Sequence, residues 1–236
     1  MRFYVGTSGY SYPKWKGSFY PAKLPQTEML KFYAERFAAV EVNNSFYRMP
    51  SVAVLKSWAE QAPESFEFAF KAPQAISHFK RLKAAAVPTK RFLKTVGVLK
   101  SRCGPLLFGL GPNFKKDLRR LVNFLKLLRG ERRVAFEFRH LSWFDDEVFD
   151  CLSKHGCALC TADEDKSPFT NLVSTANWGY VRLRRENYTG NELRAWIKRI
   201  RSQAWDETYV FFKHEDTGKG PKFATQLLEL AGKTEL

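Results

Sequence analysis

The chain has 236 residues, of which 44% are hydrophobic and 27% are charged, so it can form one large core and has the composition of a globular protein. Its apolar runs are far shorter than the ~20 residues that a membrane span requires, and its N-terminal segment lacks a hydrophobic signal region, so we expect a cytoplasmic protein without a membrane partner. The net charge of +15 predicts attraction to nucleic acids or anionic small molecules, and no pattern indicates a protein partner.

The first half of the chain alternates between strand-like and helix-like patterns. Strand patterns occupy residues 2–6, 39–43, 66–71 and 105–110. Apolar residues at helical spacing follow the first three, around 29–37, 54–58 and 93–99. Ser51 is positioned to cap the second of these helices. Residues 114–128 then carry a clear amphipathic helical pattern, which we expect to begin at Phe114.

The second half continues the alternation. Strand patterns occupy residues 133–138, 157–162, 180–184 and 209–213. Apolar residues at helical spacing follow three of these strands, at 148–152, 193–200 and 223–230, but not the strand at 157–162, the sixth of the chain. Asp145 can cap the first of these helices. Residues 164–177 look irregular instead. The eight β/α repeats predict a single domain over residues 1–236 with a (β/α)8 TIM-barrel fold, irregular around the sixth unit; an open doubly wound sheet is the alternative.

Four cysteines are present: Cys103, Cys151, Cys157 and Cys160. Disulfides are not expected in a reducing compartment. Cys157 and Cys160 have a spacing found in redox and metal sites, but they fall in an apolar strand-like run, where residues three apart face opposite sides. We therefore predict that both thiols pack in the core.

The alternation within the strands assigns a direction to their polar side chains. The apolar face of each strand must meet the surrounding helices, so the residues between face the lumen. The inward residues predicted in this way are Glu41, Asn43, Lys71, Glu137, Arg139 and Arg182. Asp163 ends the sixth strand, and Lys213 and His214 end the eighth. All lie at carboxyl ends of strands, where barrel active sites are built, although mutual ion pairing at the rim would explain the same pattern.

Longer motifs resemble a known family. They are GTSGYSYPKWKGSFYP (6–21), VEVNNSFYRMPS (40–51), FAFKAP (68–73), PNF (112–114), EFRHLSW (137–143) and VRL (181–183). From about residue 3 to the C-terminal helix, the chain resembles the YecE-like family, domain of unknown function 72. The resemblance implies a TIM barrel and no established activity. Arg184 stands where many members have His, which makes the mouth more basic and removes one proton carrier.

Four residues are candidate catalytic groups, because carboxylates and imidazoles serve as general acids, general bases or metal ligands. They are Glu41, Glu137, Asp163 and His140. With His140 or His214, the carboxylates could hold a divalent metal, but no HxH or HExxH motif supports this, so a metal is not favoured and the cofactor stays unassigned.

A second set of residues is suited to binding a ligand. Lys71, Arg139 and Arg182 can bind phosphate or carboxylate, and Ser8 and Tyr10 belong to a glycine-flanked turn that could cradle a phosphate. The other candidate ligand-binding residues are Asn43, Asn113, Tyr12, Trp15 and Tyr47. The aromatic residues among them could stack on bases or sugars, or could equally form a small hydrophobic cluster within the loops.

These patterns support two functions. The first is an enzyme, of hydrolase or phosphoesterase type, acting on a phosphate-bearing ligand such as a nucleotide or nucleic acid at the barrel mouth. The second is a non-catalytic protein that binds nucleic acid or another anion, since basic runs such as KKDLRR (115–120) also occur outside the mouth.

Overall fold

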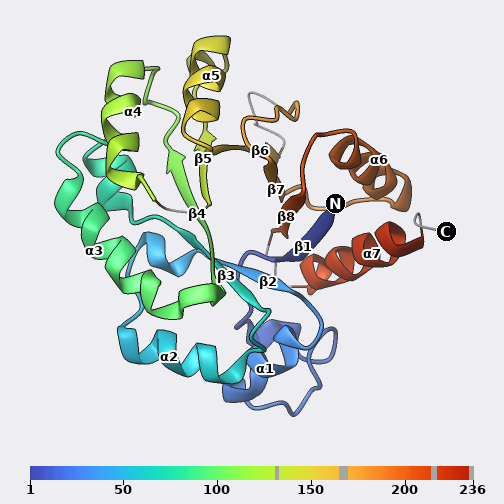
Figure 1. Cartoon of the computed structure of the whole chain (residues 1–236). Coiled ribbons are helices and arrows are strands. Elements are labelled where there is room, and N and C mark those ends of the chain that lie inside the picture. Colours follow the sequence, from blue (N-terminus) through green and yellow to red (C-terminus); the bar gives the residue numbers. More distant parts are fainter. Residues whose placement is uncertain (131–132, 165–169, 214–216, 234–236) are drawn as a thin grey trace.

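In a computed structural model, which describes residues 1–130, 133–164, 170–213 and 217–233, eight parallel strands form a nearly closed barrel (Figure 1). The strands are β1 (Arg2–Thr7), β2 (Ala39–Val42), β3 (Glu67–Lys71), β4 (Cys103–Leu110), β5 (Val134–Phe138), β6 (Ala158–Asp163), β7 (Trp178–Leu183) and β8 (Glu207–Phe212). From β2 to β8 each strand pairs with the next in the chain, and β8 pairs with β1, whereas β1 and β2 are joined by an isolated bridge between Ser8 and Glu41. The predicted TIM-barrel fold is confirmed.

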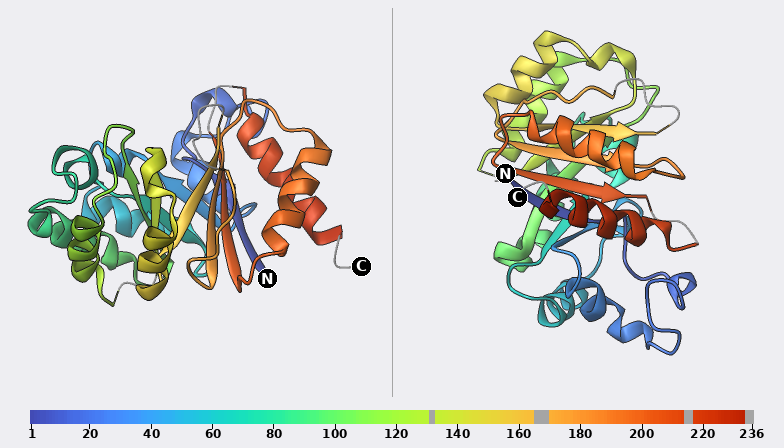
Figure 2. Two further views of the ribbon diagram at one scale, coloured as in Figure 1. Left: turned by 90° about the horizontal axis from the view of Figure 1, so that it is seen from above. Right: turned by 90° about the vertical axis from the view of Figure 1, so that its right-hand side faces the viewer.

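Helices surround the barrel. They are α1 (Met29–Ala34), α2 (Val52–Gln61), α3 (Ala86–Val96), α4 (Leu118–Leu125), α5 (Asp146–Lys154), α6 (Gly190–Arg201) and α7 (Lys219–Lys233). Figure 2 shows α6 and α7 side by side. Helix α7 packs against β8 and β1, the last and first strands of the chain, which pair with each other. The described residues between β6 and β7 contain no helix, in agreement with the predicted irregular unit. No helix in the described part of the chain is long and apolar enough to cross a bilayer.

The helix starts follow from capping chemistry. Ser51 accepts a hydrogen bond from Val54 N–H, and Asp145 accepts one from Val148 N–H, so both predicted caps are confirmed. The prediction that the fourth helix begins at Phe114 is wrong. Asp117 caps α4 instead, and the Phe114 ring packs edge-on against Trp143.

The core has two parts, as the alternation along the strands predicts. Side chains such as Val40, Phe68 and Phe136 pack outward against the helices, whereas a second cluster fills the lumen with small residues and the rings of Tyr180 and Tyr209. Cys157 and Cys160 are both buried, one in each cluster, so the prediction of core thiols is confirmed.

A group of charges that the sequence did not predict closes the amino-terminal end of the lumen. Arg133 lies 3.3 Å from the Glu67 carboxylate and also pairs with Glu207, and Tyr209 OH donates to Glu67 over 2.7 Å. We call Glu67, Arg133, Glu207 and Tyr209 the basal cluster. Its charges satisfy one another, and this end of a TIM barrel serves stability.

Candidate functional site at the barrel mouth

Arg182, on β7, links three strands across the carboxyl end of the lumen. Its side chain is 1% exposed. One guanidinium nitrogen donates to Glu41 Oε1 of β2 over 2.9 Å, and another donates to Glu137 Oε1 of β5 over 2.7 Å. Both carboxylates point into the lumen, as the strand alternation predicts. Because it is buried and doubly paired, Arg182 holds the two carboxylates in place, and its predicted role in ligand binding stays a prediction.

Glu41 is buried and has partners at both oxygens. Besides Arg182, its Oε1 accepts from Ser8 Oγ over 2.7 Å and from Asn43 Nδ2 over 3.0 Å, while its Oε2 accepts from Tyr180 OH over 2.8 Å. Burial by itself would raise the pKa of this carboxyl, but Arg182 and the hydrogen bonds lower it to about 2. Glu41 therefore stays ionised near neutral pH, where such a group is a weak proton acceptor.

Glu137 has one oxygen that no described residue hydrogen-bonds. Its Oε2 lies 3.5 Å from an Arg139 nitrogen, which is too long for a hydrogen bond, and has no other partner among the described residues. Burial favours the neutral acid, but Arg182, Arg139 and Lys71 together hold the pKa of this carboxyl well below its usual range. The result is an ionised carboxylate with one acceptor atom that can still receive a hydrogen bond.

Lys71, the last residue of β3, approaches the same place. Its Nζ lies 4.8 Å from the centre of the Phe46 ring, and no carboxylate of a described residue lies within ion-pair distance. A side chain at Gly109 would meet both Glu137 Oε2 at 3.1 Å and Lys71 Cε at 3.5 Å, so this glycine leaves room beside both groups. Burial lowers the pKa of Lys71 to about 8, and the neighbouring Arg182 adds to the effect.

Arg139 is the exposed cation of the group, because 36% of its side-chain surface is accessible, against 1% for Arg182. We call Glu41, Lys71, Glu137, Arg139 and Arg182 the mouth cluster. It holds three cations and two carboxylates, so it has an excess positive charge. The most accessible part of that charge lies on Arg139, and Lys71 is half-buried.

Two predicted catalytic residues lie outside the mouth cluster. Asp163 ends the sixth strand as predicted, but it faces α6, where it accepts hydrogen bonds from Arg185 Nε over 2.9 Å and Trp196 Nε1 over 3.2 Å. His140 Nδ1 accepts from Ser142 N–H over 3.1 Å and so caps the short helical turn Leu141–Trp143.

Other residues singled out in the sequence lie in loops and at strand ends around the barrel mouth. Asn113 is exposed in the loop after β4, and Lys213 is exposed at the end of β8. His214 lies outside the described residues. No group of three or more His, Cys, Asp and Glu side chains within the described ranges is arranged to hold a metal ion.

The aromatic residues that are candidates for ligand binding differ in how deeply they are buried. Trp15 is fully buried and stacks against Tyr20, which favours the second of the two roles left open for it, packing within the loops. Tyr12 OH donates to the Ser8 carbonyl over 2.9 Å, and Tyr10 packs edge-on against Trp58. These contacts favour the reading of this loop as a small hydrophobic cluster.

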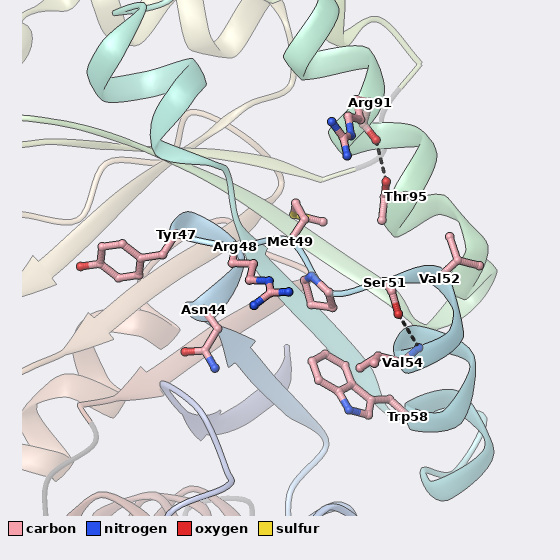
Figure 3. Close-up of a pocket in the computed structure, with 11 residues that line it drawn as sticks. Asn44, Tyr47, Arg48, Met49, Ser51, Val52, Val54, Trp58, Arg91 and Thr95 are labelled. Atoms are coloured by element: carbon pink, nitrogen blue, oxygen red, sulfur yellow. Dashed lines mark hydrogen bonds between the residues drawn. The ribbon is translucent and has the colours of Figure 1, made fainter.

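Two hollows lie beside the mouth cluster. Residues Gly9–Tyr12 face Val42–Asn44 across a cavity of about 270 Å³. A wider groove of about 800 Å³ runs from the segment after β2 to α3, and Figure 3 shows Trp58, Arg48 and Arg91 along it. Tyr47, which is 76% exposed, stands at one end of this groove. Neither hollow is lined by the charged residues of the mouth cluster.

His78 is a residue near the mouth that the sequence did not single out. It lies in a helical segment, Ala75–Phe79, and its ring meets the Phe46 ring edge-on at 4.9 Å between centres. Burial lowers its pKa, and the charges of Lys71 and Arg139 act in the same direction. Because His78 follows a strand by several residues, the alternation that oriented the strand residues could not place it.

Comparisons with known proteins give one consistent result. Residues 4–236 match a family described as "Protein of unknown function DUF72". The UPF0759 protein YecE of Escherichia coli K12 is 34% identical over 98% of this chain and 93% of that protein. The UPF0759 protein YunF of Bacillus subtilis 168 is 24% identical over 96% of this chain and 94% of its own.

Solved structures agree with these matches. The crystal structure of a DUF72 family protein from Thermotoga maritima MSB8 has a TM-score of 0.86 and 28% identity, covering 98% of this chain and 100% of the other. A DUF72 family protein from Enterococcus faecalis V583 shares the fold with a TM-score of 0.80 at 18% identity, over 98% of this chain and 95% of the other. The similarity extends over the whole barrel.

Proposed function

This chain belongs to the DUF72 family, and from the geometry of its barrel mouth we propose that it binds a phosphate-bearing ligand there, such as a nucleotide. One observation carries the proposal: the mouth cluster has more cations than carboxylates, and two of its cations, Lys71 and Arg139, are not held between two carboxylates as Arg182 is. A guanidinium and an ammonium suit the oxygens of a phosphate.

The carboxylates support anion binding in an indirect way. Glu41 and Glu137 both pair with Arg182 and hold it at the centre of the barrel, so these three groups carry one net negative charge, which Lys71 and Arg139 more than offset. Glu137 Oε2 would be left to accept a hydrogen bond from a ligand hydroxyl or from a water molecule. In the enzymatic form of the proposal, a hydrolase or phosphoesterase, that water would attack the phosphoester.

The test is calorimetric titration with inorganic phosphate and with glycerol 3-phosphate. Arg139→Gln should weaken both about tenfold, because it removes one charge-assisted hydrogen bond worth ~1.5 kcal/mol. Arg129→Gln is the matched control, since it removes the same charge from an exposed residue before β5 while Arg139 follows that strand. Equal affinities for wild type and Arg139→Gln would contradict the proposal.

Turnover separates the enzyme from the alternative. Purified protein should be incubated, with and without divalent ions, with nucleotides, nucleic acids and simple phosphoesters. Release of phosphate or cleaved product that Glu137→Gln abolishes would support the enzymatic form. Binding without turnover would support the alternative, a non-catalytic nucleic-acid- or anion-binding protein, which the net charge of +15 favours.

We also propose that the protein works in the cytoplasm. Support comes from the buried thiols of Cys157 and Cys160, which form no disulfide.

A further inference from the structure

We propose that Lys71 is a covalent amine nucleophile, which forms a Schiff base with the carbonyl group of a phosphorylated aldehyde or ketone bound at the barrel mouth. The inference rests on the proposed anion site and narrows its ligand to a carbonyl compound. Three features of the structure carry it: the position of the Lys71 amine, the groups that surround it, and the two glycines nearby.

The placement of Lys71 sets it apart from a lysine that serves as a fixed charge. It leaves the end of β3 next to the Arg182 ion pairs, yet no described carboxylate lies within ion-pair distance of its Nζ. The Phe46 ring, 4.8 Å from Nζ, covers one side of it. An amine held this way keeps its lone pair available once it loses a proton, because no salt bridge fixes the charged form.

The groups around Lys71 allow its ammonium group to lose a proton near neutral pH. Burial and the neighbouring guanidinium of Arg182 lower the pKa of Lys71 to about 8, although Glu137 and Glu41 oppose them. Arg139 acts in the same direction as Arg182, and the imidazole of His78 meets the same Phe46 ring edge-on. A lysine that is desolvated beside another cation is the usual setting for imine chemistry.

Two glycines lie beside these groups. At Gly109, on the neighbouring strand, an added side chain would lie 3.5 Å from Lys71 Cε and 3.1 Å from Glu137 Oε2. At Gly111 it would lie 3.5 Å from the His78 ring. No side chain from these two positions therefore covers the amine, the carboxylate or the imidazole.

The step balances without any added reagent. The neutral Nζ attacks the carbonyl carbon, and a C–N bond forms to give a carbinolamine. The carbonyl oxygen then takes up the proton that Lys71 released and a proton from nitrogen, and it leaves as water. Overall, one ammonium and one carbonyl yield one protonated imine and one water. Glu137 Oε2 is placed to accept a hydrogen bond from the carbinolamine hydroxyl.

The experiment is reductive trapping on the wild-type protein. Protein is mixed with glyceraldehyde 3-phosphate or dihydroxyacetone phosphate, treated with borohydride, digested, and mapped by mass spectrometry. The expected result is an adduct on Lys71 that excess inorganic phosphate suppresses, with half-maximal yield near pH 8, the value to which its pKa is lowered. Exposed Lys80 is the internal control, and its labelling should be insensitive to phosphate. Labelling of Lys71 that is no greater than that of Lys80 would overturn the proposal.

One variant and one binding measurement separate this inference from the anion site itself. Lys71→Arg cannot form an imine, so it should lose the adduct at position 71 while Lys80 is labelled as in wild type. If wild type binds glycerol 3-phosphate through Arg139 but gives no adduct, Lys71 is a fixed charge and only the covalent step fails. If glycerol 3-phosphate does not bind at all, the proposed function fails first.

Discussion

Arg182 shows how one buried residue can organise a site without being offered to a ligand. The strand alternation predicts its direction correctly, and carboxylates at 2.7 Å and 2.9 Å hold two of its nitrogens. Arg139 is the more accessible cation, and Lys71 lies half-buried beside it. At the residue scale, then, the site consists of a fixed internal ion group and two further cations.

Removing Arg182 should therefore affect stability strongly. Arg182→Met leaves Glu41 and Glu137 buried without their cation, and we expect a loss of about 3–5 kcal/mol in the free energy of unfolding. Arg184→Met is the control, because Arg184 forms an ion pair with Glu164, which is 32% exposed, and such pairs contribute about 1 kcal/mol or less. Urea denaturation measures both, and equal losses would show that Arg182 is not the organising charge.

The sequence predicts the direction of strand residues better than that of loop residues. Glu41, Lys71 and Glu137 could be placed because alternation on a strand leaves only two faces. Asp163 ends its strand on the outer face, and its carboxylate meets α6 instead of the lumen. Burial of Trp15 and the approach of His78 depend on how loops fold over the barrel, and no periodic pattern records that.

At the scale of elements, the seam between β1 and β2 is the least regular part of the barrel. The two strands share an isolated bridge, between Ser8 and Glu41, in place of a continuous ladder. The hydroxyl of Tyr33 fills the gap: it accepts from Thr7 N–H over 2.7 Å and donates to the Ala39 carbonyl over 3.2 Å. A helix side chain thus completes the hydrogen bonding of the sheet.

Tyr33→Phe should open this seam. The substitution keeps the buried ring but leaves Thr7 N–H and Ala39 C=O without their partner, which costs about 1–3 kcal/mol of unfolding free energy. Amide exchange should accelerate in β1 and β2 more than in β4 or β5. Tyr47→Phe, at a residue that is 76% exposed, serves as the control and should change neither quantity. Unchanged exchange in Tyr33→Phe would mean that the seam does not depend on this hydroxyl.

The periodic signals predict elements well and their ends less well. All eight strands are found where alternation or continuous apolar character predicts them, and Ser51 and Asp145 begin their helices. Phe114 shares the spacing of α4 without belonging to it, because its ring packs against Trp143 in the preceding loop. The spacing of apolar residues indicates which side chains are buried. A loop residue can be buried in the same way as a helix residue, so this spacing alone does not fix where the helix begins.

At the scale of the whole molecule, charges close both ends of the lumen in different ways. The basal cluster is satisfied internally, since Glu67 and Glu207 share Arg133. The mouth cluster keeps an excess cation and an unpartnered carboxylate oxygen. One end therefore holds the barrel together, and the other is suited to a ligand.

The salt dependence of DNA binding can distinguish the barrel mouth from the rest of the basic surface. With a net charge of +15, the protein should bind duplex DNA at low salt, and the logarithm of its affinity should fall linearly with the logarithm of the salt concentration. Arg139→Gln should reduce that slope by about 1 at most, because it removes one of many surface cations, while phosphate binding falls about tenfold. Filter binding across a salt series measures the slope. A parallel collapse of DNA and phosphate binding in Arg139→Gln would instead make the mouth the nucleic-acid site, since a diffuse basic surface cannot depend so heavily on one guanidinium.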